Sequence, residues 1–371
     1  MSEHGLKERL RGWDAKRWAF VVLQVVLALG CGACLVGFWF VSHALETTTA
    51  AQRFRGESET RFAQMACFLP VGQGKTEEQI FEFRSGLDTK FVEQSLEAPE
   101  GGSLYVDAYS GTASVSLSTD HGSATVEATG VGGDFFYFHP LQLRSGAYIS
   151  QSDLMDDLVV LDELLAWRLF GGIDLTGMTL YINGVPFVVS GVVSLEEDFA
   201  TNRAYTQEGG LFMSYSALGK LDETLSVNCY EIVLPDPISG YARSIVETGF
   251  PPEVGDTVEN SSRYTIGHLL EVIGSFGERS MRTNGVIYPY WENALRLTED
   301  YSALLLVLAV LFGLCPVISA MAVAILGVRR GYRHAREAIP AKVEAAVERR
   351  REKQYGEFLE EEAKGEETWP S

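Results

Sequence analysis

Residues 18–41 read WAFVVLQVVLALGCGACLVGFWFV and contain no charged side chain. A helix of about 20 apolar residues crosses the hydrocarbon core of a bilayer, so this 24-residue stretch is long enough to span one. A second uncharged stretch, YSALLLVLAVLFGLCPVISAMAVAILGV, covers residues 301–328. A soluble chain of 371 residues offers too small a core to bury both stretches. We therefore predict two transmembrane helices, 18–41 and 301–328.

The first stretch can also be interpreted as a cleaved signal peptide, because basic residues precede it. The apolar region of a signal peptide usually has about 7–15 residues and ends at a cleavage site of small residues. Here the apolar stretch is longer and runs into Ser42-His43-Ala44-Leu45-Glu46. The sequence favours an uncleaved membrane anchor.

Charge predicts the orientation of the two spans, because cytoplasmic flanks of membrane helices are enriched in Lys and Arg. The segment 43–300 holds 15 basic and 37 acidic residues. We expect a multi-pass protein of the cell (inner, cytoplasmic) membrane, with segments 1–17 and 329–371 in the cytoplasm and an extracytoplasmic domain at 42–300. The net charge of −20 argues against nucleic-acid binding, since few cations are free to contact phosphates. The basic residues nearest the spans are Lys7, Arg9, Arg11, Lys16, Arg17, Arg329, Arg330, Arg333 and Arg336.

Hydrophobic periodicity predicts an α+β domain between the spans. A polar segment at 43–60 is expected to extend the first span as a helical stalk, and residues 291–301 are expected to form the second stalk. The Asn183-Gly184 pair between two alternating runs predicts a hairpin, and Thr76 with Gln79 predicts a helix cap. The expected strands are 61–69, 104–117, 124–129, 158–161, 178–182, 187–193 and 229–234, and the expected helices are 76–96, 162–170, 238–248 and 262–276.

Motifs of known chemistry were considered, and none predicts a catalytic, cofactor or metal site. Gly74-Lys75-Thr76 resembles the end of a phosphate-binding loop, but Leu69 stands where that loop requires glycine. An acidic group at 153–163 offers oxygen atoms to Ca²⁺, yet acidic residues at helix starts have an ordinary electrostatic explanation. The external histidines lack zinc-site spacing. We therefore expect a protein that is not an enzyme. The residues weighed are Asp153, Asp156, Asp157, Asp162, Glu163, His43, His121, His139 and His268.

Three segments in order, GVGGDFFYFHPLQLRSGAYIS, VVLDELLAWRLFGG and DLTGMTLYINGVPFVVSGVV, resemble the MacB-like periplasmic core domain of FtsX-type ABC transporter permeases. The resemblance implies a split domain on stalks, with membrane-proximal parts at about 43–120 and 226–300 and a distal part at about 121–225. It also implies a permease-type role in efflux or mechanotransmission. The matching positions are Gly130, Asp134, Phe135, Phe136, Leu143, Gly146, Tyr148, Ala166, Leu169, Phe170, Gly171, Gly177, Leu180, Ile182, Asn183 and Gly184.

The chain departs from that family after the external domain, where a typical permease of this kind has three spans and this chain has one. The resemblance therefore implies partners: a separate ABC ATPase subunit, an FtsX-like permease or further copies of this chain, and membrane lipid. The alternative is a membrane-anchored extracytoplasmic module that binds or senses a ligand without transporting it.

Cys67 and Cys229 are the cysteines between the spans, and two cysteines in an oxidising compartment usually pair. In the resembled fold their strands lie in one membrane-proximal sheet. We therefore expect a disulfide between them. The remaining cysteines, Cys31, Cys34 and Cys315, lie within the spans, and Gly30, Gly32 and Ala33 beside them are typical of close helix packing.

The predicted topology is testable with cysteines placed on the two sides of the membrane. A cysteine at Ser103 should react with an impermeant maleimide in intact cells, because the external domain is exposed to the medium. A cysteine at Ser371 should react only after lysis, with the unmodified protein as the background control. Labelling of the Ser371 position in intact cells would contradict the two-span arrangement.

Overall fold

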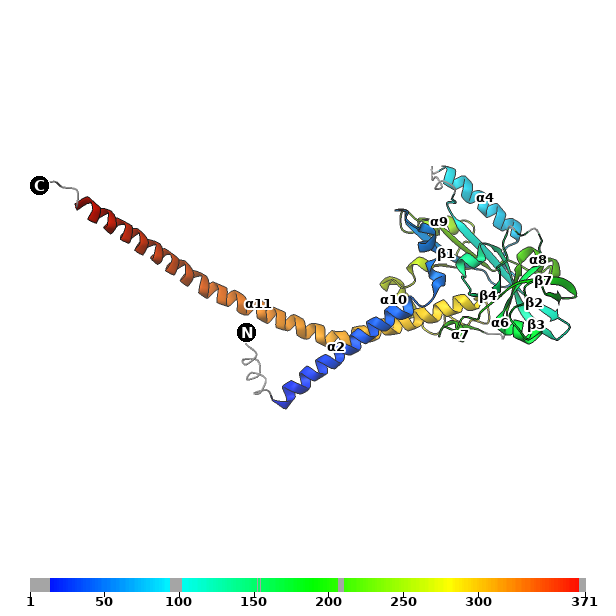
Figure 1. Ribbon diagram of the computed structural model, residues 1–371, viewed down its shortest axis with the longest axis horizontal. Helices are drawn as coiled ribbons and strands as arrows, with labels where there is room; N and C mark the ends of the chain where they lie inside the picture. Colours follow the sequence, from blue (N-terminus) through cyan, green and yellow to red (C-terminus); the bar gives the residue numbers. More distant parts are fainter. Residues whose placement is uncertain (1–13, 94–101, 152, 154, 206–209, 367–371) are drawn as a thin grey trace. The chain divides into compact units, whose positions relative to one another are not determined.

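Both uncharged stretches form long helices in the computed structural model, which describes residues 14–93, 102–151, 153, 155–205 and 210–366. They lie in α2 (Ala15–Ser42) and α11 (Tyr290–Glu366), drawn in blue and in yellow to red in Figure 1. Within the described residues, these are the two helices long and apolar enough to span a membrane. The two-span architecture predicted from the sequence is thus confirmed. Most of segment 1–17 and Ser371 lie outside the described residues.

The chain forms two compact units. Residues Val36–Leu306 form the external unit, which includes the outer ends of both membrane helices. Met1–Leu35 and Val307–Ser371 form the other unit. Within that second unit the side chain of Phe312 lies against Gly30, where an added Cβ would be 3.1 Å from the ring. Gly30 therefore allows close helix packing, as predicted, whereas a Cβ at Gly32 would meet open space.

The two stalks differ from each other. The second is helical as predicted, because α11 runs without a break from Tyr290 into the span. The first is not a continuous helix: α2 ends at Ser42, and the chain turns into η1 (Glu46–Thr49) and α3 (Ala50–Arg55). Ala50 and Ala51 are buried in a hydrophobic cluster of the external domain. The free energy gained by this packing exceeds what a continued helix would gain.

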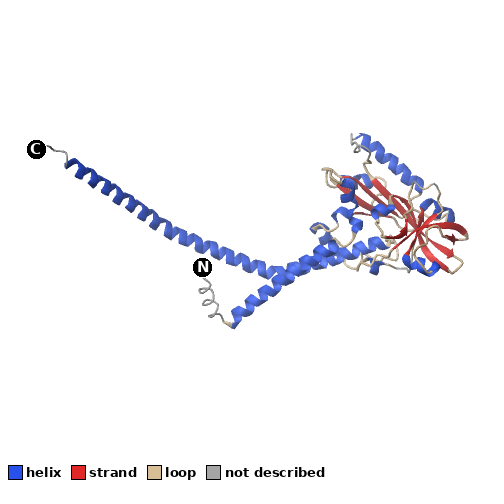
Figure 2. Ribbon diagram, in the orientation of Figure 1, coloured by secondary structure: helices blue, strands red, loops and turns tan. Residues whose placement is uncertain are grey.

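The external domain is built on one mixed sheet, shown in red in Figure 2, whose main strand order is β10-β1-β9-β2-β3-β8-β5-β7-β4, with β6 beside β2 and β7. The long antiparallel hairpin of β2 and β3 joins the two ends of this sheet. The strands are β1 (Phe62–Phe68), β2 (Val106–Ser118), β3 (Ser123–Gly133), β4 (Leu143–Gly146), β5 (Leu158–Asp162), β6 (Thr179–Ile182), β7 (Val185–Val193), β8 (Leu211–Ser214), β9 (Cys229–Pro235) and β10 (Asp256–Glu259).

Short helices cover the sheet and connect its strands. They are α4 (Glu77–Glu93), α5 (Phe135–Phe138), α6 (Glu163–Phe170), α7 (Thr201–Ala204), α8 (Tyr215–Leu221), α9 (Tyr241–Val246), the 3₁₀ turn η2 (Asn260–Ser262) and α10 (Ile266–Gly274). Two local predictions are confirmed here. The Thr76 backbone N–H donates to Gln79 Oε1 at 3.1 Å, and Gln79 N–H donates to Thr76 Oγ1 at 3.4 Å. Asn183 and Gly184, both at positive φ, turn β6 into β7.

Burial along β2 shows how the domain is layered. From Thr112 to Ser118 every second residue is buried, so this part of the strand has one covered face. The preceding residues, Asp107 to Gly111, are all buried, because the sheet is covered on both faces there. One hydrophobic cluster, containing Val115, Leu161 and Leu180, fills the outer part, and two others pack on opposite faces of β1 and β9.

The predicted disulfide is wrong, because both Cys67 and Cys229 are free thiols. The two strands are adjacent, as the resemblance implied, but Cys67 pairs in register with Tyr230, and Cys229 pairs with Phe68. A one-residue offset in a strand places side chains on opposite faces of the sheet. Cys67 accordingly packs in one hydrophobic cluster and Cys229 in another. Burial raises the pKa of Cys67 to about 12 and that of Cys229 well above its usual value.

Gly133, which ends β3 opposite Ala108 of β2, allows a test of how closely these two strands pack. It has φ +69°, and an added Cβ would lie 2.3 Å from the carbonyl oxygen of Asp107. Gly133→Ala should therefore destabilise the fold by roughly 1–3 kcal/mol, because backbone would have to move. The matched change Gly86→Ala meets no atom within 4 Å and lies inside helix α4. It should stabilise slightly, and a similar loss of thermal stability in both variants would contradict this account.

Candidate functional site

The first turns of α11 carry charged residues that face into the external domain. Glu292, Arg296 and Glu299 lie four and three residues apart, a spacing that places them on one side of a helix. All three are buried, with 1%, 6% and 0% of their surface exposed. Charged side chains are almost never buried so completely unless they are paired. This end of α11 is therefore the part of the described structure where charge and burial coincide most strongly.

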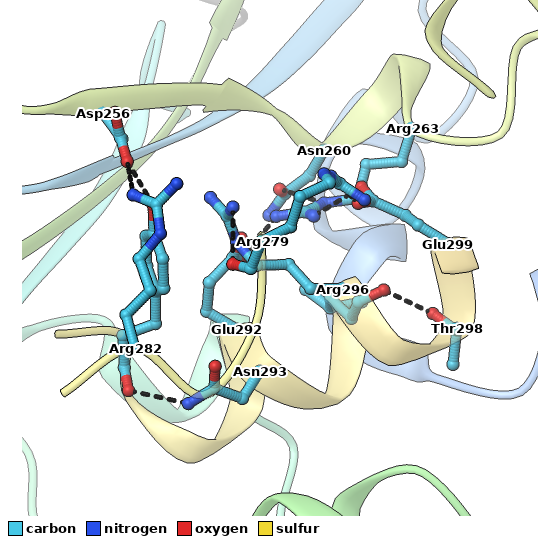
Figure 3. Close-up of polar contacts among 12 residues, drawn as sticks. Asp256, Asn260, Arg263, Arg279, Arg282, Glu292, Asn293, Arg296, Thr298 and Glu299 are labelled. Atoms are coloured by element: carbon cyan, nitrogen blue, oxygen red, sulfur yellow. Dashed lines mark hydrogen bonds and ion pairs between the residues drawn. The ribbon is translucent and has the colours of Figure 1, made fainter. Parts of the chain in front are cut away.

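Arg263, just after η2, is the centre of this arrangement (Figure 3). Its guanidinium donates to Glu299 Oε1 at 2.7 Å and to Glu292 Oε2, and its Nε donates to Asn260 Oδ1 at 2.8 Å. Arg296 Nε donates to the other oxygen of Glu292 at 2.7 Å, and Arg279 donates to the other oxygen of Glu299. We call Arg263, Arg279, Arg296, Glu292 and Glu299 the ion-pair cluster.

The electrostatics of Arg263 explain why the ion-pair cluster holds together. Its side chain is fully buried, which opposes its charge, but Glu292 and Glu299 outweigh that cost and raise the pKa of its guanidinium. Pairs of this kind contribute little net stability compared with apolar residues, yet removing one partner leaves a buried charge uncompensated. The ion-pair cluster thus fixes the position of α11 more than it raises the total stability.

Further contacts extend this attachment around the start of α11. Asn293 accepts from the Met281 backbone N–H at 2.8 Å and donates to the Tyr288 carbonyl at 2.9 Å. Arg296 also stacks on the Tyr288 ring, with its guanidinium carbon 3.7 Å from the ring centre, and donates to the Arg279 carbonyl at 3.1 Å. The segment 279–288 is therefore attached to α11 through contacts of both its backbone and its side chains.

A second buried pair joins α11 to the sheet. His139 Nε2 lies 2.6 Å from Glu231 Oε2 on β9, and both side chains are at most 5% exposed. The His139 ring packs between Phe135 and Trp291, with ring centres 4.5 and 4.6 Å away. Trp291 is the second residue of α11, so the helix contacts the middle of the sheet through this stack. In the sequence His139 stands out only as one of the external histidines without zinc-site spacing, since nothing in the pattern pairs it with Glu231.

A cleft of about 270 Å³ lies between α4, the β2–β3 hairpin and residues 149–151, 153, 155, 156 and 158. Its lining combines aromatic side chains with charged and polar ones, and several of the polar groups are paired with one another. Arg84 Nε donates to Asp107 Oδ2 at 2.7 Å, and Tyr109 O–H donates to Glu77 at 2.5 Å. An added Cβ at Gly132 would lie 2.1 Å from the Tyr109 ring, so glycine there makes room for that ring. The cleft can contact apolar or aromatic groups. Aromatic side chains along it are Phe81, Tyr109, Phe135, Phe136 and Tyr215.

Two of the acidic residues that could offer oxygen atoms to Ca²⁺, Asp156 and Asp162, have other partners. Asp162 caps α6 by accepting from the Leu165 N–H at 2.7 Å. Asp156 accepts from Lys220 at 2.9 Å and from Ser216 at 3.1 Å. Among the described residues, no group of three or more His, Cys, Asp or Glu side chains is placed to hold a metal ion. The described residues in the first part of this acidic group, Asp153 and 155–157, form no helix.

The importance of Arg263 is testable by removing its charge. Arg263→Met removes the cation that pairs with the buried carboxylates of Glu292 and Glu299. It should destabilise the fold by about 3 kcal/mol or more. Lys220→Met removes the same charge from an exposed pair with Asp156, and it should cost less than about 1 kcal/mol. Thermal unfolding of the purified full chain measures both changes. Equal losses in the two variants would show that the ion-pair cluster has no special structural role.

The chain is similar to several solved structures and to one family model. Similar solved structures include the periplasmic region of MacB from Actinobacillus actinomycetemcomitans, with 19% identity, TM-score 0.40, and coverage of 60% of this chain and 98% of that one. The extracellular domain of the ABC-type transporter YknZ from Gram-positive bacteria is 13% identical, with TM-score 0.35 and coverage of 50% and 88%. No curated protein sequence matches. The family model described as the MacB-like periplasmic core domain matches residues 27–242, more than half of the chain, and the chain therefore belongs to that family.

Proposed function

We propose that the protein is a permease-type membrane component of a MacB/FtsX-like ABC transport system, working in efflux or in mechanotransmission. Membership of the MacB-like periplasmic core domain family and the two apolar helices support an ABC permease-type component. The ion-pair cluster is the observation that most favours a mechanical role. It fastens the external domain to a helix that continues unbroken into the membrane.

The physical basis of the proposal is stiffness. A continuous helix keeps all its backbone hydrogen bonds and carries a displacement along its axis, whereas an irregular linker absorbs it. α11 meets this requirement from Tyr290 to Cys315, before Pro316, which has no N–H to donate. α2 does not meet it, because α2 ends at Ser42 before the chain enters the domain. We therefore propose α11 as the transmitting element. Movement of the membrane end of α11 would reach η2 through Arg263 and reach the sheet through Trp291 and His139.

The remaining parts of the system would come from other chains. In this proposal the chain itself is not an enzyme, and ATP is hydrolysed by a separate ABC ATPase subunit in the cytoplasm. An FtsX-like permease, or further copies of this chain, would complete the membrane part, because this chain contributes two spans. The chain would lie in the cell membrane with its domain outside.

The cleft favours a second candidate function. A cleft of about 270 Å³ on the external domain, lined by aromatic and polar side chains, suits a binding or sensing module anchored in the membrane, without transport. The two functions differ in whether ATP hydrolysis changes the external domain.

Partner capture provides the first test of this proposal. The tagged full chain should be cross-linked in native membranes, purified and identified by mass spectrometry together with its neighbours. We expect an ABC ATPase and either a multi-span permease or cross-links between copies of this chain. Recovery of this chain without an ATPase would favour the membrane-anchored binding module.

Helix stiffness is tested by a matched pair of insertions after Asp300, on the membrane side of the ion-pair cluster. Four glycines and four alanines add the same length, but glycine lowers helix stability by about 1 kcal/mol per residue relative to alanine. Labels at Val92 and His121 would report ATP-dependent distance changes within the external domain of the assembled complex. We expect the alanine insertion to retain more of the change than the glycine insertion. Equal responses from the two insertions would contradict transmission through α11.

A further inference from the structure

α10 packs against the outer ends of both membrane helices. Leu269 and Val272 of α10 are buried, at 0% and 1% exposed, in a cluster with Ala303 of α11. Phe38 of α2 and Leu306 of α11 pack against the same cluster. α10 is therefore in direct contact with residues that belong to the uncharged stretches 18–41 and 301–328.

These contacts set the level of α10 relative to the bilayer. At 1.5 Å per residue, Phe38 lies about 5 Å inside the outer end of its uncharged stretch, and Leu306 lies roughly 8 Å inside the end of the other. Interfacial helices bury their apolar face about 5–10 Å into the boundary between headgroups and acyl chains. The level of α10 thus matches that of a helix lying in this boundary.

The face of α10 that points away from the membrane helices is apolar too. Ile266 and Leu270 are 66% and 61% exposed, and they lie one helical turn apart. Gly267 and Gly274 fall on the same side by helical spacing, and an added Cβ at either would meet no atom within 4 Å. The exposed acid Glu271 lies at one edge of this face, about 100° around the helix from Leu270.

This apolar face is accompanied by other exposed apolar residues at the same level. Trp39 and Phe40 near the end of α2 are 56% and 61% exposed, and Leu304 of α11 is 46% exposed. Tryptophan is enriched where membrane helices leave the bilayer. The exposed face of α10 thus lies at the same depth as the parts of α2 and α11 that the two-span architecture places in contact with lipid.

We propose that α10 is an interfacial helix whose Ile266 and Leu270 face contacts the acyl-chain boundary of the outer leaflet. Lipid, rather than water, then covers this face, and the base of the external domain rests on the membrane surface. α10 is also connected to the ion-pair cluster, since His268 Nε2 lies 3.2 Å from Glu299 Oε1. The bilayer contact and the attachment of α11 therefore belong to one rigid region. This inference holds for a transporter and for a sensing module alike.

Photo-cross-linking of the full chain in native membranes tests the contact. A benzophenone side chain is placed at Leu270 and, in a second variant, at Ile266. Both positions are exposed, so the change leaves the core intact. The matched control is Ile238, which is 76% exposed on the external domain before α9. We expect about tenfold more phospholipid adducts at the two α10 positions than at Ile238, detected by mass spectrometry.

The same experiment distinguishes lipid from a protein partner. Phospholipid adducts in excess at both α10 positions support the proposal, whether or not partner proteins are also captured. Lipid adducts no more frequent than at Ile238 overturn it, and a polypeptide cross-link in their place would show that a partner covers the helix. Thermal unfolding within about 2 °C of the unmodified protein confirms that each variant is folded.

Discussion

The burial of Arg263 between Glu292 and Glu299 is the constraint on which the base of the external domain depends. A guanidinium removed from water in this way needs both carboxylates, and both come from α11. The helix therefore has one axial position and one rotation in which the charges are satisfied. The ion-pair cluster thus supplies a defined register between a membrane helix and the domain outside.

The rest of the structure builds outward from that register. Trp291 carries the contact to His139 and Glu231 in the sheet, and His268 carries it to α10 beside the membrane helices. The long β2–β3 hairpin then connects this base to the outer end of the domain. α11 therefore contacts His139 beside the sheet through Trp291 and α10 through Glu299.

Some elements of the fold depend on neighbouring residues in the chain, and others depend on tertiary packing. The Thr76–Gln79 cap and the Asn183-Gly184 turn formed as predicted, because their hydrogen bonds and φ angles involve neighbours in the chain. The polar segment 43–60 did not continue α2, because Ala50 and Ala51 find a buried surface that the sequence does not reveal. Four-residue strands such as β8 and β10 were missed for a related reason, since a run that short shows no periodicity.

The sequence by itself determined the two spans, the α+β class, the family and the general placement of strands and helices. These depend on composition, on periodicity and on motifs read along the chain. Tertiary structure alone decided the register of β1 against β9, and a one-residue offset there placed Cys67 and Cys229 on opposite faces and excluded their disulfide. It also decided the ion-pair cluster, because Arg263 and Glu299 are 36 residues apart and no local rule brings them together. Pairing between distant side chains depends on the folded backbone, and a linear pattern does not encode that geometry.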